Sequence, residues 1–129
     1  MNKNLNKTTV ETLEITGSET TPSLNFNKQK NLFTIEGKSL MEDANKFYKP
    51  LQEWLAEYRK SPNQKTELNI RLEYLNTATS RQFLDLFKIL EGLPDSKIVW
   101  QFSDEDEDME EMGQELAELV TVPFEFKTF

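Results

Sequence analysis

Three short stretches near the start of the chain alternate apolar with polar residues. Their apolar positions are Leu13 and Ile15, then Leu24 and Phe26, then Leu32, Phe33 and Ile35. The polar segment 27–31 separates the second stretch from the third, and Gly37 follows the last. Alternation with a period of two on both sides of a polar turn is typical of a β-hairpin. The pattern therefore predicts an N-terminal hairpin whose last strand ends at Gly37.

After residue 39 the apolar residues take the spacing of a helix. One helix face collects Phe47, Leu51, Trp54, Leu55 and Tyr58. The segment 39–42 has the spacing of a capping box, which predicts that the helix begins there. Pro50 lies inside the helical pattern. Because proline lacks a backbone donor and crowds the carbonyl four residues back, we expect a kink or a break near Lys49.

The rest of the chain alternates strands with helices. Strands are expected over 68–75, 98–102 and 122–126. One helix is expected over about 80–91, with Gly92 as its C-terminal stop. Its inner face would carry Phe83, Leu86, Phe87 and Leu90. A last helix would present Met109, Met112, Leu116 and Leu119. This order predicts an α/β fold, with helices packed on a mixed sheet that begins with the hairpin.

Length and composition limit the possible functions. The chain has 129 residues, near the commonest size of one domain, so we expect a single domain over 11–129 after a flexible segment 1–10. Cys and His are both absent, which removes thiolate chemistry, the usual general base near neutral pH and the commonest metal ligand. The net charge of -8 argues against nucleic acid and anionic membranes as partners. No secretory signal or membrane span is recognisable, so we expect a cytoplasmic protein without cofactor or metal.

Two other features have ordinary structural interpretations. In the acidic run 104–108 and the segment after it, Asp104 and Glu115 take the first and twelfth positions of an EF-hand loop. However, Met109 stands where that loop needs Gly, so we interpret the run as an acidic helix start. Weak binding of a divalent ion or of a basic partner is left open. Trp54 and Trp100 are in phase with apolar neighbours and are expected in the core.

A cluster of hydroxyl residues, 76–80, lies where a predicted strand passes into a predicted helix. Such residues commonly cap helices, and Thr79 with Gln82 fits a capping box, so local sequence favours a purely structural role. The unpaired N–H groups and the dipole of a helix N-terminus also stabilise anions. A phosphate on this cluster would add about -1.5 to -2 charges without unfolding the domain. The cluster is therefore a candidate regulatory site.

The run 72–77, Leu-Glu-Tyr-Leu-Asn-Thr, with the small hydroxyl residues after it, resembles the signature of the SiaC family of bacterial regulatory phosphoproteins. Further similarity lies in the Thr21-Pro22 start, the helix around Trp54, the Trp100 strand, the acidic run and the Val122-Pro123-Phe124 ending. The resemblance implies a fold like that of STAS-domain anti-sigma-factor antagonists. It also implies reversible phosphorylation by a GHKL-type Ser/Thr kinase and a PP2C-type phosphatase. In the family's best-known system, the unphosphorylated form binds and activates a diguanylate cyclase.

Carried over by position, the resemblance makes Thr77 the phosphoacceptor, with Asn76, Ala78 and Ser80 around it. The family usually has Ser where this chain has Ala78. Thr79 is the second candidate, but a hydroxyl engaged in a cap would be poorly presented to a kinase. One alternative function is a constitutive STAS-like scaffold in which Thr77 is only a helix cap. Another is a small-molecule or metal-dependent enzyme, which the lack of His and Cys and the presence of only 4 Gly disfavour.

Overall fold

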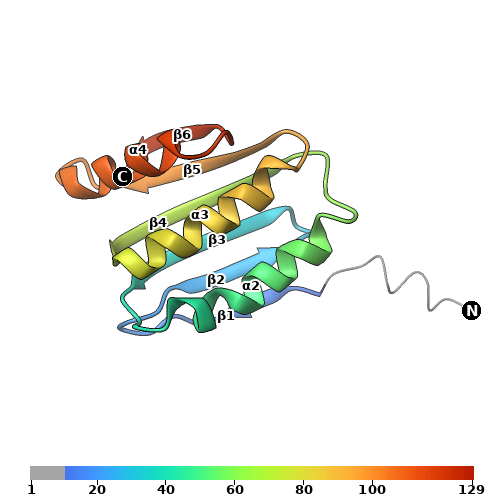
Figure 1. The fold of residues 1–129 in the computed structure, drawn as a ribbon, viewed down its shortest axis with the longest axis horizontal. Helices are drawn as coiled ribbons and strands as arrows, with labels where there is room; N and C mark the ends of the chain where they lie inside the picture. Colours follow the sequence, from blue (N-terminus) through green and yellow to red (C-terminus); the bar gives the residue numbers. More distant parts are fainter. Residues whose placement is uncertain (1–10) are drawn as a thin grey trace, which may run out of the picture.

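The computed structural model describes residues 11–129, so the expected flexible segment 1–10 lies outside the described residues. The element order is the following (Figure 1): β1 Leu13–Ile15, β2 Ser23–Asn27, β3 Leu32–Ser39, α2 Ala44–Tyr58, β4 Thr66–Leu75, α3 Thr77–Glu91, β5 Ser96–Phe102, α4 Glu107–Glu118 and β6 Phe124–Thr128. The predicted order of strands and helices is confirmed.

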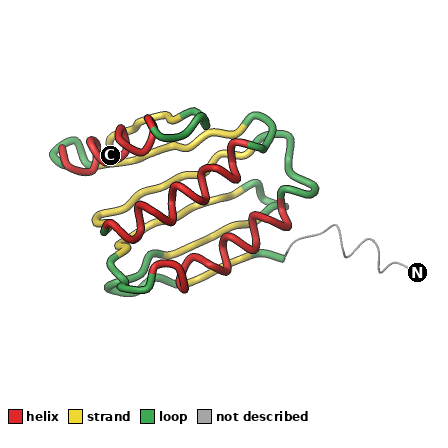
Figure 2. The backbone as a smooth tube through the Cα atoms, viewed as in Figure 1, coloured by secondary structure: helices red, strands yellow, loops and turns green. Residues whose placement is uncertain are grey.

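All strands join one mixed sheet in the order β1-β2-β3-β4-β5-β6. The pairs β1–β2 and β2–β3 are antiparallel, and the pairs from β3 to β6 are parallel. The predicted hairpin is β2–β3, closed by the turn at 28–31. Each parallel crossover moves one strand further in the same direction. Because such crossovers are right-handed, all three helices lie on one face of the sheet (Figures 1 and 2).

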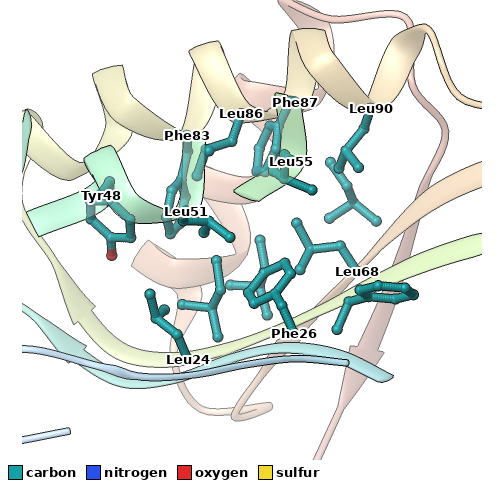
Figure 3. Packing of buried hydrophobic residues seen from close by; sticks show 14 of the residues in the cluster. Leu24, Phe26, Tyr48, Leu51, Leu55, Leu68, Phe83, Leu86, Phe87 and Leu90 are labelled. Atoms are coloured by element: carbon teal, nitrogen blue, oxygen red, sulfur yellow. The ribbon is translucent and has the colours of Figure 1, made fainter. Parts of the chain in front are cut away.

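The hydrophobic core lies between the helices and the sheet (Figure 3). Phe83, Leu86, Phe87 and Leu90 on α3 are all buried, as their spacing predicts. Trp54 and Trp100 are buried as well. Helix α3 ends with Gly92 as its C-cap, which confirms the predicted stop. Strand β4, at the centre of the sheet, buries Leu68, Ile70 and Leu72 under the helices. The residues that alternate with them are exposed or half-buried.

One prediction about α2 is wrong, and a second is wrong in its stronger form, the break near Lys49. The helix does not begin with a capping box at Ser39, because Ser39 is the last residue of β3 and Asp43 is the N-cap. Nor does Pro50 break the helix, which continues through it to Tyr58. Pro50 and Lys46, whose carbonyl loses its partner, are both exposed. Water can satisfy that carbonyl, so the break is not required.

Strand β3 also continues past its predicted end. Gly37 does not close the strand but sits within it, with φ of 119°. The pairing with β4 shifts register between Gly37 and Lys38, which marks a β-bulge. Glycine adopts this positive φ without steric cost. The strand then reaches Ser39, whose backbone carbonyl accepts a hydrogen bond from Asn76 N–H at 3.1 Å.

Candidate functional site: the start of helix α3

Helix α3 begins at Thr77, directly after β4, which is three residues earlier than a cap at Thr79 would place it. Its N-cap is Asn76, whose side-chain oxygen accepts the backbone N–H of Thr79 at 2.9 Å. The Asn76 amide nitrogen donates to the Met41 carbonyl at 3.0 Å, which ties the cap to the segment before α2. The predicted capping box of Thr79 with Gln82 is therefore wrong. The alternative that Thr77 is the helix cap is also wrong, because Asn76 has that role.

Thr79 lies inside the domain, with 0% of its surface exposed. Its hydroxyl is 2.7 Å from the Ser39 hydroxyl and 2.8 Å from Asn76 Oδ1. The Ser39 hydroxyl is in turn 2.7 Å from the Tyr48 hydroxyl. One donor order satisfies the whole chain: Tyr48 donates to Ser39, Ser39 to Thr79, and Thr79 to Asn76. These four side chains, the hydroxyl network, join β3, α2 and α3 below the surface.

Tyr48 is the titratable member of the hydroxyl network. Burial raises the pKa of its phenol well above the usual range, although the hydrogen bond to Ser39 lowers it in part. The phenol therefore stays protonated and keeps its role as a donor. A network fully satisfied in this way fixes the position of the α3 N-terminus relative to β3.

Thr77 occupies the first turn of α3 with its side chain exposed. In the described residues 11–129, no group forms a hydrogen bond with the Thr77 hydroxyl, whereas those of Thr79 and Ser80 are engaged. Ala78 next to it is half-buried and packs against the core. Ser80 is half-buried as well, with its hydroxyl 3.4 Å from the Asn76 carbonyl and 3.6 Å from Met112 Sδ. Within the cluster 76–80, Thr77 is the hydroxyl residue with the greatest exposure.

A shallow groove lies next to this helix start, between the end of β4 and α4. It encloses about 240 Å³ and is lined by Glu73, Tyr74, Leu75, Asp106, Asp108, Met109 and Met112. Met112 also contacts Ser80, and Leu75 directly precedes the Asn76 cap, so the groove adjoins the first turn of α3. Its floor is apolar and its rim carries three carboxylates. Tyr74 on the rim is 58% exposed, which is unusual for so large a side chain.

The second half of the acidic run forms the start of α4, as the sequence interpretation predicts, and Asp104 and Glu105 lie in the turn before it. Asp106 is the N-cap and accepts the Met109 N–H at 3.0 Å. Glu107, Asp108 and Glu110 lie in the first turn, where the helix dipole favours negative charge. In the described part of the chain, no group of three or more acidic side chains is arranged to hold a metal ion.

Ser39, Tyr48 and Met112 are site residues that sequence reasoning missed. The sequence places Ser39 in a predicted capping box, and Tyr48 lies one position from Phe47, which the helical pattern places on the inner face. In the structure Tyr48 is fully buried and Phe47 is only half-buried. The helix phase set by Ala44, Tyr48, Leu51 and Leu55 is the signal that could have found Tyr48.

The fold defines a small two-layer α/β domain that carries its helices on one face of a mixed sheet. Residues 15–129 match the family model described as SiaC family regulatory phosphoprotein. The match covers most of the chain, so this protein belongs to the SiaC family. A curated relative, an uncharacterized protein of Pseudomonas aeruginosa strain UCBPP-PA14, is 26% identical over 117 residues, covering 87% of this chain and 92% of the relative.

Solved structures of SiaC from Pseudomonas aeruginosa have the same fold. Apo-SiaC superposes with a TM-score of 0.82 and 22% identity, over 91% of this chain and 98% of that one. SiaC in the crystal structure of its complex with the diguanylate cyclase SiaD, of which it is the activator, gives a TM-score of 0.79 at 24% identity, over 91% and 99% of the two chains. The predicted α/β fold is thereby confirmed, and its STAS-like description is compatible with it.

The described residues contain no helix of sufficient length and apolar character to span a bilayer.

Proposed function

We propose that this protein is a non-enzymatic signalling module that binds an effector protein and is controlled by reversible phosphorylation of Thr77. The observation that carries the proposal is the contrast within one helix turn. Thr77 is exposed, whereas Thr79 is fully buried in the hydroxyl network and Ser80 is half-buried. A kinase must draw the acceptor hydroxyl into its own site, which an exposed side chain allows without unfolding.

The position of Thr77 also suits a phosphate once it is attached. The side chain of Asn76 already caps the Thr79 N–H, and the first N–H groups of a helix have no intrahelical partners. A phosphate on Thr77 would lie beside these donors at the positive end of the helix dipole. The modified state would therefore be accommodated locally, with the charge presented at the surface.

The groove beside α3 supports a role in partner binding. An effector that covers Leu75 and Met112 would have to exclude water from the neighbouring first turn. A phosphate dianion placed there is costly to desolvate. It also adds charge to a rim that already carries Glu73, Asp106 and Asp108. Phosphorylation is therefore expected to weaken effector binding, so that the unphosphorylated form is the one that binds.

Family membership suggests the identity of the partners. SiaC of Pseudomonas aeruginosa is the activator of the diguanylate cyclase SiaD and forms a complex with it. On that precedent the effector here is a diguanylate cyclase. The modifying enzymes would be a GHKL-type Ser/Thr kinase and a PP2C-type phosphatase, working on a cytoplasmic protein. A constitutive scaffold without phosphorylation would have the same fold but would bind its effector regardless of the state of Thr77.

Copurification of a diguanylate cyclase tests the proposal. Tagged full-length chain, with Thr77→Ala and Thr77→Asp variants, is isolated from its own cells and the bound proteins are identified by mass spectrometry. We expect the cyclase to copurify with the Thr77→Ala chain. The amount of cyclase recovered with Thr77→Asp should be at least tenfold lower. Lys88→Gln, which also lowers the net charge by one at an exposed position eleven residues further along the same helix, is the matched charge control and should recover the cyclase as the wild type does. Equal recovery with Thr77→Ala and Thr77→Asp would support the constitutive scaffold instead.

A further inference from the structure

Strand β6 forms one edge of the sheet and is hydrogen-bonded on one side only, to β5 (Figure 1). The other edge is the strand β1 of only three residues. Short edge strands are a common protection against pairing with another chain. Strand β6 is longer, with five residues, and carries no proline between Phe124 and Thr128. An edge of this kind can accept a further strand.

The hydrogen bonds at both ends of β6 define which of its backbone groups are unpaired. Ile98 N–H donates to the Pro123 carbonyl at 2.9 Å, and Phe129 N–H donates to the Phe102 carbonyl at 3.1 Å. In a parallel ladder the groups that face the neighbouring strand alternate along the chain. Residues 123, 125, 127 and 129 therefore face β5. The N–H and C=O groups of Phe124, Phe126 and Thr128 point outward, with no partner in the described part of the chain.

The side chains of β6 are complementary to those of a second copy of β6 that runs antiparallel to it. Glu125 and Lys127 lie on the face of the sheet without helices, where Glu125 pairs with Lys97 at 2.6 Å and Lys127 at 3.6 Å. Phe126 lies on the helix face, 37% exposed, with its ring 5.7 Å from that of Phe124. If a second copy of β6 pairs antiparallel with Phe126 opposite Phe126, each Glu125 comes opposite a Lys127 of the other copy. The two exposed phenylalanines then meet on the helix face.

The same register satisfies the backbone. Phe126 becomes a hydrogen-bonded pair with its own copy, and Phe124 becomes one with Thr128 in both directions. All outward groups of these three residues are then used. Glu125 and Lys127 fall at non-hydrogen-bonded positions, where opposing side chains are closest. Shifting the two-fold axis by one residue in either direction puts Glu125 opposite Glu125 or Lys127 opposite Lys127, which is destabilising. Charge and hydrogen bonding therefore select one register.

We propose that β6 is a self-association edge, through which two copies of this chain join their sheets by antiparallel pairing centred on Phe126. The arrangement is isologous and closes on itself, so it gives a dimer and not a filament. Because the contact is a single strand pair, the dimer is weak and depends on concentration. It leaves the α3 start out of the strand pairing, and it does not depend on the proposed role of Thr77.

Charge exchange and sedimentation equilibrium test the self-association. Lys127→Glu places Glu opposite Glu125 in the dimer, and we expect it to weaken dimerisation roughly tenfold. The double variant Glu125→Lys with Lys127→Glu restores opposite charges and should recover the affinity. A wild-type chain that stays monomeric up to about 1 mM would overturn the proposal. Equal dimerisation by Lys127→Glu and the wild type would overturn the register.

Crosslinking locates the interface. The chain has no cysteine, so Phe126→Cys introduces a single thiol, placed opposite its own copy in the dimer. A short bis-maleimide crosslinker should join two Phe126→Cys chains into a covalent dimer. The control, Glu14→Cys on β1, carries its thiol on the opposite edge of the sheet and should stay monomeric. Equal crosslinking of both variants, or none with Phe126→Cys, would contradict β6 pairing.

Discussion

The hydroxyls of Ser39 and Thr79 lie 2.7 Å apart and are both fully buried, although 40 residues separate them in the chain. This contact joins the end of β3 to the first turn of α3. It also removes Thr79 from the set of hydroxyls that an enzyme can reach. The proposal that Thr77 is the phosphoacceptor thus depends on the tertiary contact that Thr79, two residues further along, makes with Ser39.

Replacing Thr79 by valine should destabilise the fold. The isosteric methyl cannot hydrogen-bond to Ser39 or Asn76, which leaves buried polar groups unsatisfied. We expect a loss of about 1–3 kcal/mol in the free energy of unfolding, measured by urea denaturation. Thr77→Val at the exposed position should change stability by less than about 0.5 kcal/mol. Equal effects of the two substitutions would mean that the hydroxyl network is not formed.

The cap of α3 should depend on both polar atoms of the Asn76 side chain. Asn76→Ala removes the acceptor for the Thr79 N–H and the donor to the Met41 carbonyl, and should cost about 1–2 kcal/mol in thermal or urea unfolding. Asn76→Asp keeps the acceptor but loses the donor, so we expect an intermediate stability. An Asn76→Asp protein as unstable as Asn76→Ala would show that the hydrogen bond from the Thr79 N–H to this side chain contributes nothing.

Gly113 on α4 should not tolerate alanine. An added Cβ would lie 2.5 Å from Cδ1 and Nε1 of Trp100, whose indole is held by a hydrogen bond to the Met109 carbonyl at 2.9 Å. Alanine normally stabilises a helix interior relative to glycine by about 1 kcal/mol. Here the overlap with the ring outweighs that gain, and we expect a loss of about 1–3 kcal/mol. Gln114→Ala on the exposed face is the control, and a more stable Gly113→Ala protein would refute the close packing.

Tyr48 should make stability fall at alkaline pH. Its pKa is raised in the folded state, so the folded protein keeps the phenolic proton at a pH where the unfolded chain begins to release it. Its contribution is fully present below the ordinary tyrosine pKa of about 10 and is lost as the pH rises above it. The free energies of unfolding of wild type and Tyr48→Phe are measured by urea denaturation from neutral pH to above about pH 10. The difference between the two proteins should become smaller as the pH rises. A constant difference would contradict the buried, protonated phenol.

The fold follows from the sequence wherever one periodicity dominates. The inner face of α3, with Phe83 and Phe87, is a regular helical stripe, and β2 and β3 alternate cleanly around a polar turn. Helix starts are less well determined by the sequence, because several consecutive residues can each act as the N-cap. In the cluster 76–80 the N-cap is Asn76 and not Thr79, because the Thr79 side chain makes the buried contact with Ser39. Such a selection by tertiary packing has no signature in local sequence.

The candidate site could be placed only in part. The junction of β4 and α3 is evident from the patterns on either side of it, and the exposed position of Thr77 fits the expectation of an accessible hydroxyl. The groove beside it is formed by α4, whose position over β5 is set by the packing of Gly113 on Trp100. A glycine in a helical pattern does not by itself identify the ring that it contacts. The neighbourhood of Thr77 therefore required the three-dimensional structure.

Mapping the phosphorylated residue tests the central claim most directly. The full-length chain and its Thr77→Ala and Ser80→Ala variants are isolated from their own cells and examined by intact mass and tandem mass spectrometry. Our account predicts one phosphate on Thr77 in the wild type and in Ser80→Ala, and none in Thr77→Ala. A phosphate that persists in Thr77→Ala, or one located on Thr79 or Ser80, would contradict it.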